Sequence, residues 1–331
     1  MIEINLHNLK ANINYYASSQ KKLIGVVKNN AYGHGSITIA KALVNFGLDY
    51  LFVNELEEAL PLVEAGIKVP ILIHNSLNPN EYHYLSKYPN LVVTLNSYQD
   101  YLSLLADPKL DKVKVHLQID TKMNRLGIKT YQEYEQLLKM LIAHSKFIIE
   151  GIYTHFASLE VMNEQINTFR PFAEAYPYPM VHCAASATAH LCSYGNYARI
   201  GLGLYHHQQL MSVKVKPLKI QYLEAGEALG YNGKYVAKEK EIIAVLPLGY
   251  GDGYSRRFEG FHVYCNEKYY EIVGRICMNH LFVKVDKYIN LDSVFEVLSP
   301  KIPASLLAEY INTIPYEIYT MWQYRKVKYL S

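Results

Sequence analysis

The chain has 331 residues, and 33 Lys and Arg residues against 30 Asp and Glu residues leave a formal net charge of +3. Its 50% hydrophobic and 19% charged residues are typical of a globular protein, and the small basic excess favours neither a nucleic acid nor a membrane surface as partner. No apolar run approaches the roughly 20 residues of a membrane-spanning helix, and residues 1–5 lack the basic flank of an export signal, so we expect a soluble, cytoplasmic protein.

Up to about residue 205, short apolar runs alternate with segments of helical period, such as residues 36–46, 55–64 and 131–144. This alternation is typical of repeated βα units around a parallel sheet. The apolar runs are residues 23–27, 50–53, 69–73, 91–94, 113–119, 147–153, 180–183 and 198–202. Strands of this number and spacing predict a closed α/β barrel of the TIM type, with an open sheet as the alternative that periodicity alone leaves.

Beyond residue 210 the pattern changes to alternating runs, which predict a second, mainly antiparallel β domain. Its expected strands are residues 219–222, 235–245, 262–265, 269–272 and 281–285. Turn signals such as Tyr231-Asn232-Gly233 separate them. We therefore expect a barrel domain over residues 1–210 and a C-terminal β domain over residues 211–331. The opening β-like run, residues 2–6, is a candidate to join the second domain.

The four cysteines are Cys183, Cys192, Cys265 and Cys277. They show neither Cys-x-x-Cys spacing nor the density of a disulfide scaffold. We expect reduced thiols and no bound metal.

Polar side chains follow several of the predicted strands, at the rim where a barrel builds its active site. Lys28, Arg125, His155 and Ser186 come after such runs, and Arg199 lies in the last run of the barrel. Taken singly, a solvated lysine, a structural histidine or a helix-capping serine is the more ordinary interpretation. Their joint placement at one rim favours a catalytic site.

A lysine at the end of an apolar strand suits imine chemistry, because a desolvated amine has a lowered pKa and can attack a carbonyl. This indicates either a substrate imine or pyridoxal 5′-phosphate (PLP). Ser186 and the nearby Gly201 and Gly203 offer a hydroxyl and unhindered backbone N–H groups, which are the parts of a phosphate site. Together with Lys28 they favour PLP.

Residues 26–35, Val-Val-Lys-Asn-Asn-Ala-Tyr-Gly-His-Gly, resemble the PLP-lysine signature of the alanine racemase family. The resemblance continues, in the family's order, over nearly the whole chain. The further motifs are residues 120–127, 153–157, 199–205, 249–253, 274–278 and 313–317. The resemblance implies a PLP-dependent homodimer that interconverts L-alanine and D-alanine and supplies D-alanine for peptidoglycan.

The resemblance also implies roles for individual residues. Lys28 matches the lysine that holds PLP and acts as one catalytic base, and Tyr231 matches a second base delivered from the other subunit. Arg199 matches the arginine that faces the pyridine nitrogen. The phosphate-binding set would be Tyr32, Ser186, Gly201, Leu202 and Tyr316.

Further matches surround these groups. Arg125 and the backbone of Met278 match groups near the cofactor O3′ and the substrate carboxylate. His155, also expected at the cofactor, and His182 resemble histidines that link the arginine to the acidic tyrosine through hydrogen bonds. Tyr250 is expected to support the site.

Two acid–base groups on opposite faces are the least that racemisation needs, because an α-proton leaves one face and a proton returns to the other. A phenol has an ordinary pKa near 10, so Tyr231 needs positive charge nearby, which Arg199 could supply through His155. Arg199 itself is effectively never deprotonated and cannot give the pyridine nitrogen a proton. We therefore expect a weakened electron sink and suppressed side reactions such as transamination.

The sequence departs from the family pattern at several sites. Gln118 stands where many members carry a carbamylated lysine that pairs with the equivalent of Arg125. Without that anion, we expect a buried Arg125 to attract a small anion such as chloride, or a nearby carboxylate. Ala185 replaces a common Asn and Asn279 a common Asp, which puts the electrostatics of the site and its substrate preference in question.

Other functions stay open at this stage. A racemase of serine or a longer amino acid is possible, because discrimination by one methylene is worth only about 1–3 kcal/mol. A decarboxylase of the same barrel type is disfavoured by Arg199, since the group facing the pyridine nitrogen there is acidic. A non-catalytic PLP carrier would resemble the barrel alone and would leave the β domain and Tyr231 without a purpose.

Overall fold

The computed structural model describes residues 1–322 and 327–330 and contains two compact units. The barrel unit is Lys10–Leu204, and the β unit combines Met1–Leu9 with Tyr205–Ser331. Among the described residues, no helix combines the length and the apolar character needed to cross a membrane.

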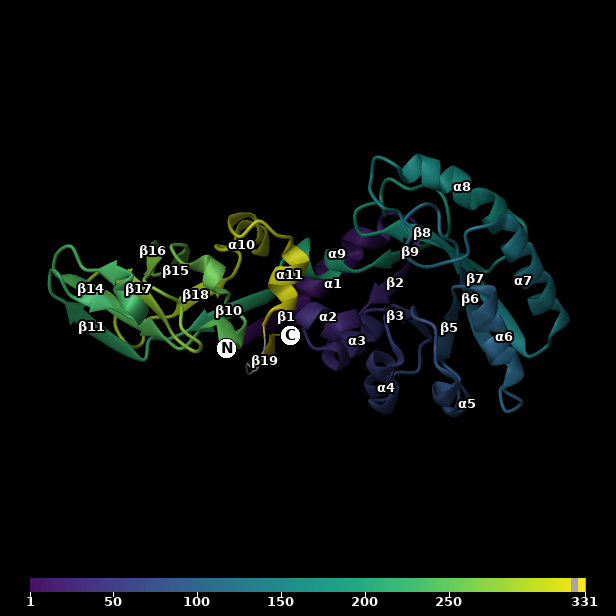
Figure 1. The fold of residues 1–331 in the computed structure, drawn as a ribbon, viewed down its shortest axis with the longest axis horizontal. Helices are drawn as coiled ribbons and strands as arrows, with labels where there is room; N and C mark the ends of the chain where they lie inside the picture. Colours follow the sequence, from purple (N-terminus) through teal and green to yellow (C-terminus); the bar gives the residue numbers. More distant parts are fainter. Residues whose placement is uncertain (323–326, 331) are drawn as a thin grey trace. The chain divides into compact units, whose positions relative to one another are not determined.

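The barrel unit is built on a closed parallel barrel, which confirms the predicted fold (Figure 1). Its strands are β2 (Lys22–Val26), β3 (Leu51–Val53), β4 (Ile71–Ile73), β5 (Leu91–Leu95), β6 (Val113–Gln118), β7 (Phe147–Tyr153), β8 (Met180–Ala185) and β9 (Tyr197–Ile200). β9 pairs with β2 in the register Gly25↔Ile200 and closes the ring. The carboxyl ends of all these strands therefore meet at one rim.

Helices and short turns connect the strands. They are α1 (Leu6–Ala17), α2 (Lys28–Gly33), α3 (Ser36–Asn45), α4 (Leu56–Glu64), η1 (Pro79–Glu81), α5 (His83–Lys87), α6 (Tyr98–Ala106), α7 (Tyr131–Ala143), α8 (Met162–Glu174) and α9 (Leu202–His206). The predicted helical segments correspond to α3, α4 and α7. Helix α4 ends before Gly66, whose φ of +89° suits a glycine after a helix C-terminus.

Most predicted strands of the barrel differ from the observed ones by one or two residues at an end, and two of these differences have a clear physical cause. The run 69–73 yields a strand only from Ile71, because Pro70 has no backbone N–H to donate to a ladder. The run 198–202 ends as a strand at Ile200, since Leu202 already begins α9. The chain thus turns at Gly201, which belongs to the expected phosphate-binding set.

The β unit contains a long mixed sheet in the order β11-β14-β17-β16-β15-β18-β10-β1-β19 and a small sheet of β12 and β13, within the described residues. The strands are β1 (Ile2–Asn5), β10 (Met211–Val215), β11 (Lys219–Leu223), β12 (Ala228–Leu229), β13 (Tyr235–Val236), β14 (Glu241–Leu246), β15 (His262–Cys265), β16 (Lys268–Val273), β17 (Leu281–Val285), β18 (Phe295–Leu298) and β19 (Val327–Leu330). The short helices are η2 (Tyr231–Gly233), η3 (Tyr250–Asp252), η4 (Arg256–Phe258), α10 (Ala304–Tyr310) and α11 (Pro315–Thr320). The opening strand β1 pairs with β10 and β19.

The single strand predicted over residues 235–245 is wrong. The structure divides it into β13 and β14, because the charged and exposed residues 238–240 lie in a turn between them. Strands β10, β12, β18 and β19 did not appear in the prediction.

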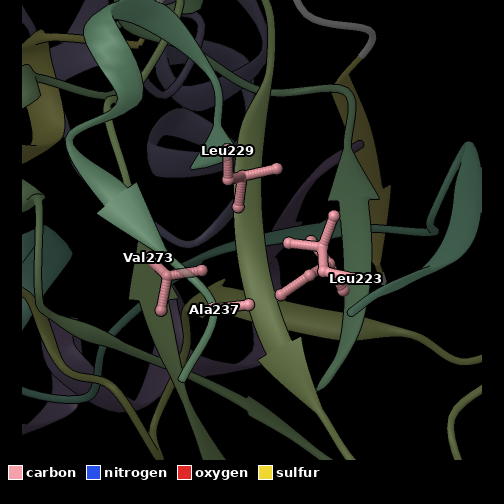
Figure 2. Packing of buried hydrophobic residues seen from close by; sticks show 5 residues of the cluster. Leu223, Leu229, Ala237 and Val273 are labelled. Carbon is pink, nitrogen blue, oxygen red and sulfur yellow. The ribbon is translucent and has the colours of Figure 1, made fainter. Parts of the chain in front are cut away.

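A small apolar cluster anchors the hairpin that carries Tyr231. Leu229, from the strand before the turn, packs with Leu223, Ala237, Ile243 and Val273 (Figure 2). All these side chains are at most 8% exposed. The turn at Tyr231 thus projects from a hairpin that is fixed at its base.

Candidate active site

Lys28 directly follows the buried strand β2 and begins an unusual left-handed turn. Asn29, Asn30, Ala31 and Tyr32 all have φ between +51° and +55°. This region is disfavoured for residues other than glycine, so neighbouring groups must stabilise the turn. It sets Lys28 and Tyr32 at the carboxyl rim of the barrel.

The amine of Lys28 lies in a cationic, partly buried environment. Its pKa is lowered from the ordinary value, first by burial and then by the charges of Arg125 and Arg199, while Glu58 opposes the shift. A lowered pKa makes a neutral, nucleophilic amine more available near pH 7. The sequence predicted this shift from the apolar strand alone, and the neighbouring arginines add to it.

Three residues of the expected phosphate-binding set converge in the structure. A β-carbon on residue 201 would lie 2.3 Å from the hydroxyl of Tyr32, so only glycine permits this approach. The Ser186 hydroxyl accepts hydrogen bonds from the N–H groups of Gly201 (3.1 Å) and Gly203 (3.0 Å). Hydroxyls and glycine N–H groups in one place have the donor chemistry that a phosphate needs.

Arg199 is 5% exposed, and four of its five N–H groups are engaged by neighbours. Nη1 donates to the carbonyl of His182 (2.8 Å) and to its Nδ1 (2.9 Å). Nη2 donates to the carbonyl of Thr154 (2.8 Å) and to Nδ1 of His155 (3.2 Å). The Nε–H is the remaining donor, and among the described residues nothing accepts from it. It suits an acceptor such as a pyridine nitrogen.

The two histidines beside Arg199 differ in their surroundings. Burial, followed by the charges of Arg199 and Arg125, lowers the pKa of the half-buried His155 to about 3, so its imidazole is neutral near pH 7. His182 is fully buried, and its second ring nitrogen lies 2.9 Å from His116. Both nitrogens of His182 thus have partners inside the barrel. Its expected part in a link between Arg199 and the acidic tyrosine stays a prediction.

Two buried residues that the sequence analysis missed, His74 and Thr94, meet Gln118 at the Tyr153 hydroxyl. His74 Nδ1 lies 2.9 Å from it and the Thr94 hydroxyl 3.1 Å. The Tyr153 hydroxyl donates to the side-chain oxygen of Gln118 at 2.8 Å. The signal for His74 was available, because it directly follows the apolar run 69–73, as Lys28 follows its own strand.

Gln118 also explains how the loop of Arg125 is held without a carbamylated lysine. Its amide donates to the carbonyl of Leu126 at 3.2 Å, next to Arg125 in the chain. Arg125 itself is exposed. Water can therefore solvate its charge in the single chain, and the expected anion beside Arg125 stays a prediction.

Tyr231 lines a pocket of about 270 Å³ in the β unit. The other lining residues are Asn232, Tyr250, Arg256, Arg275, Ile276 and Cys277. The Nε of Arg275 is buried and without a hydrogen-bond partner among the described residues. The pocket therefore offers cationic groups beside an exposed phenol, and Arg256 and Arg275 are candidates that the sequence analysis did not single out.

Glu259 holds this pocket together. Its carboxylate pairs with Lys234 (2.5 Å), just after the Tyr231 turn, and with Arg256 (3.3 Å). It also accepts from the backbone N–H of Ile276 at 3.2 Å. One carboxylate thus ties three segments of the pocket wall.

The remaining predicted site residues are distributed over the two units. Leu202 begins α9 next to Gly201 in the barrel unit. Tyr250 and Met278 are neighbours in the β unit, because the N–H of Gly251 donates to the Met278 carbonyl at 2.8 Å. Tyr316 lies in α11 of the same unit. The exposed fractions of Tyr231, Tyr250, Met278 and Tyr316 are 67%, 46%, 57% and 41%.

Comparisons with known proteins cover the whole chain. The family described as "Alanine racemase, N-terminal domain" matches residues 4–209, and "Alanine racemase, C-terminal domain" matches residues 210–329. The chain is 32% identical to an alanine racemase of Anoxybacillus flavithermus, over 94% of this chain and 88% of the relative.

Solved structures are similar over the same extent. The crystal structure of alanine racemase from E. faecalis has a TM-score of 0.93 and 29% identity, covering 99% of this chain and 97% of that one. That of alanine racemase from Bartonella henselae with covalently bound pyridoxal phosphate has a TM-score of 0.90 and 28% identity, covering 100% of this chain and 99% of that one.

Proposed function

The chain belongs to the alanine racemase family, whose members interconvert L-alanine and D-alanine, and from this premise we propose how its own residues serve that reaction. The proposal is carried by three features that occur together at one rim of the barrel. They are a lysine with a lowered pKa, a set of hydrogen-bonding groups suited to a phosphate, and a buried arginine. A second acid–base group, Tyr231, is supplied by the β unit.

We propose PLP as the cofactor, held covalently by Lys28. The residues present fit this group. The Tyr32 hydroxyl, the Ser186 hydroxyl and the Gly201 N–H suit its phosphate, and the Nε–H of Arg199 suits its pyridine nitrogen. When bound, PLP withdraws electrons from the substrate and makes the α-proton acidic. The relative from Bartonella henselae, solved with covalently bound pyridoxal phosphate, supports the assignment.

The two bases act on opposite faces of the substrate in this proposal. Lys28 Nζ removes the α-proton of D-alanine, and Tyr231 Oη removes that of L-alanine. The group on the opposite face, Tyr231 when Lys28 is the base and Lys28 when Tyr231 is the base, then donates a proton to the α-carbon, so the configuration inverts. The lowered pKa of Lys28 supports its role, since a base must be deprotonated at the working pH.

Arg199 orients and stabilises but does not transfer a proton in this proposal. Its guanidinium stays protonated and donor-only, so it can hydrogen-bond a pyridine nitrogen without protonating it. Its Nη2 donates to Nδ1 of His155, which leaves the proton of neutral His155 on Nε2. That N–H can stabilise the phenolate of Tyr231.

For the substrate carboxylate, we propose Arg125 and the backbone of Met278 as binding groups. The exposure of Arg125 supports a role toward a ligand, because no internal anion neutralises it among the described residues. Arg256 and Arg275 line the pocket of Tyr231 and would attract the carboxylate on its way to the site.

We propose a homodimer in which Tyr231 of one subunit serves Lys28 of the other. The two bases belong to different units of the chain, and Tyr231, Tyr250 and Met278 carry large apolar surfaces that are exposed in one chain. A partner subunit would cover such surface. In line with the family resemblance, the reaction would take place in the cytoplasm and its D-alanine would supply peptidoglycan.

The decisive experiment is to incubate the purified protein with L-alanine in deuterated water. The proposal expects D-alanine that carries deuterium at the α-carbon, and turnover of serine under the same conditions measures the strictness for alanine. A visible absorption band of bound cofactor without racemisation would contradict the proposed function and favour a PLP carrier.

A further inference from the structure

A chain of hydrogen bonds runs from Arg199 into the barrel, away from the cationic rim. Arg199 Nη1 donates to Nδ1 of His182 at 2.9 Å, and His182 Nε2 lies 2.9 Å from Nδ1 of His116. His116 Nε2 is 3.1 Å from the hydroxyl of Tyr50 and 3.4 Å from Oε2 of Glu150. The Tyr50 hydroxyl donates to the same Glu150 oxygen at 2.5 Å.

The two ends of this chain determine the protons between them. A guanidinium can only donate, so Nδ1 of His182 must accept and its proton must sit on Nε2. His182 then donates to Nδ1 of His116, whose proton is likewise on Nε2. At the far end, the carboxylate of Glu150 only accepts. Each histidine therefore has one neutral tautomer that satisfies both neighbours.

Burial favours the neutral form of both histidines. His116 and His182 are fully buried, and burial is the main cause that lowers the pKa of each. Although burial opposes ionisation of Glu150, hydrogen bonds from His116 and Tyr50 hold the pKa of its carboxyl below the ordinary value. The far end thus stays an anion.

The backbone is shaped for this contact. In the pairing of β6 with β7, Val115 is opposite Ile149 and His116 is opposite Gly151, so Glu150 is the extra residue of a β-bulge. Bulges re-aim side chains next to functional sites. A β-carbon on Gly151 would lie 2.5 Å from the imidazole of His116, so the ring fits only because residue 151 is glycine.

Ring stacking fixes the imidazole of His182 in addition. It is stacked on the ring of Tyr153, with centroids 4.8 Å apart and planes at 15°. The guanidinium carbon of Arg199 lies 5.0 Å from the centroid of the same ring. The lone pair on Nδ1 of His182 is therefore held toward the guanidinium.

We propose that His116, supported by Tyr50 and Glu150, is a positioning residue that locks His182 in the Nε2–H tautomer and so holds the Arg199 guanidinium with its Nε–H free for the cofactor. This inference rests on the proposed function of Arg199. It assigns a supporting role to residues that lie behind Arg199, away from the reacting atoms.

The test reads the histidine tautomers directly, on protein labelled with ¹⁵N-histidine and free of substrate. Long-range ¹H–¹⁵N correlation spectra at neutral pH should show His182 and His116 as neutral Nε2–H tautomers with slowly exchanging ring protons. His116→Leu removes the acceptor and should speed exchange of the His182 ring proton and mix its tautomers. His116→Gln keeps an acceptor oxygen for His182 and should restore the wild-type His182 signal.

Activity provides a second readout. Around metal sites, loss of a hydrogen bond that supports a functional side chain typically lowers metal affinity or activity by roughly 10- to 100-fold. We expect a decrease of that order in kcat for His116→Leu, with KM little changed. His116→Gln should not show this decrease. A wild-type His182 in the Nδ1–H form, or unchanged His182 signals in His116→Leu, would overturn the inference. The wild-type spectrum decides even if the leucine variant does not fold. An inactive protein with the expected tautomers would instead overturn the proposed function.

Discussion

The carboxylate of Glu58 on α4 accepts a hydrogen bond from the backbone N–H of Asn29 at 2.6 Å, at the first residue of the left-handed turn after Lys28. Its second oxygen accepts from the N–H of Asn54 at 2.7 Å, at the end of β3. One side chain thus joins the segments that follow two neighbouring strands, and its charge lies near the amine that we propose to hold the cofactor.

The charge of Glu58 gives the first prediction. Because Glu58 raises the pKa of Lys28 against burial and the arginines, Glu58→Gln should lower this pKa further. In apoprotein, the rate at which an acylating reagent modifies Lys28, followed by peptide mass spectrometry, should therefore reach half its maximum at a lower pH. Glu57→Gln, an exposed neighbour on the same helix, is the control. An unchanged or higher midpoint in Glu58→Gln would exclude this electrostatic role.

The second prediction concerns the cofactor lysine. The purified protein should be yellow, and sodium borohydride should fix the cofactor irreversibly to the one peptide that contains Lys28. Lys28→Ala should abolish the fixation, whereas Lys22→Ala, at the opposite end of the same strand, should retain it. Labelling of any other lysine would refute the assignment of Lys28.

The third prediction tests the shared site. If each site combines Lys28 of one subunit with Tyr231 of the other, the inactive Lys28→Ala and Tyr231→Phe proteins should regain part of their activity when their subunits are exchanged. In a statistical mixture, the mixed dimers contain one intact site. Absence of recovery in dimers shown to be mixed would place both residues in the site of one subunit.

The fourth prediction separates the two bases. Tyr231→Phe removes the phenol and keeps the ring, and loss of such a proton-transfer group typically costs on the order of a hundred- to ten-thousand-fold in rate. Turnover should fall in both directions, because forward and reverse flux are equal at equilibrium. Exchange of the α-proton with solvent should nevertheless survive far better for D-alanine than for L-alanine. Equal residual exchange of both enantiomers would point to a single mobile base.

The fifth prediction concerns acid stability and the left-handed turn. Nδ1 of the fully buried His34 donates to the carbonyls of Ala31 (3.0 Å) and Tyr32 (2.9 Å), and burial lowers the pKa of His34 to about 4. As the pH falls below 6.5, His34 becomes protonated in the unfolded chain but stays neutral in the folded state. The free energy of unfolding should therefore decrease from pH 6.5 down to about pH 4. A shift of this size corresponds to a loss of about 3 kcal/mol.

The measurement is urea unfolding at several pH values between 7.5 and 4. His34→Asn, whose amide can still donate to the same carbonyls, should show a shallower dependence on pH than the wild type. His83→Asn is a matched control, because exposed His83 also contacts a carbonyl through Nδ1. If the free energy of unfolding depended on pH equally in His34→Asn and in the wild type, His34 would not be the cause of the loss of stability in acid.

Local residue patterns were enough to predict the parallel strands of the barrel and the place of its lysine, although closure of the sheet came from the structure. Apolar runs indicate strands that are buried on both faces, and this pattern can be recognised from residues that are adjacent in the chain. For the same reason the position of Lys28, directly after the run 23–27, predicted a desolvated amine with a lowered pKa. In the β unit the signal was weaker, because short strands such as β12 and β13 carry few residues and residues 238–240 interrupt the pattern.

The tertiary structure decided which partners these side chains meet. His116 and His182 are 66 residues apart in the chain, and no local pattern joins them. Closure of the barrel and the bulge at Glu150 bring them together. Likewise, the exposure of Arg125 follows from the fold of its loop, which Gln118 ties through the carbonyl of Leu126. Residue type is local information, whereas solvent exposure and hydrogen-bond partners depend on contacts between segments distant in the sequence.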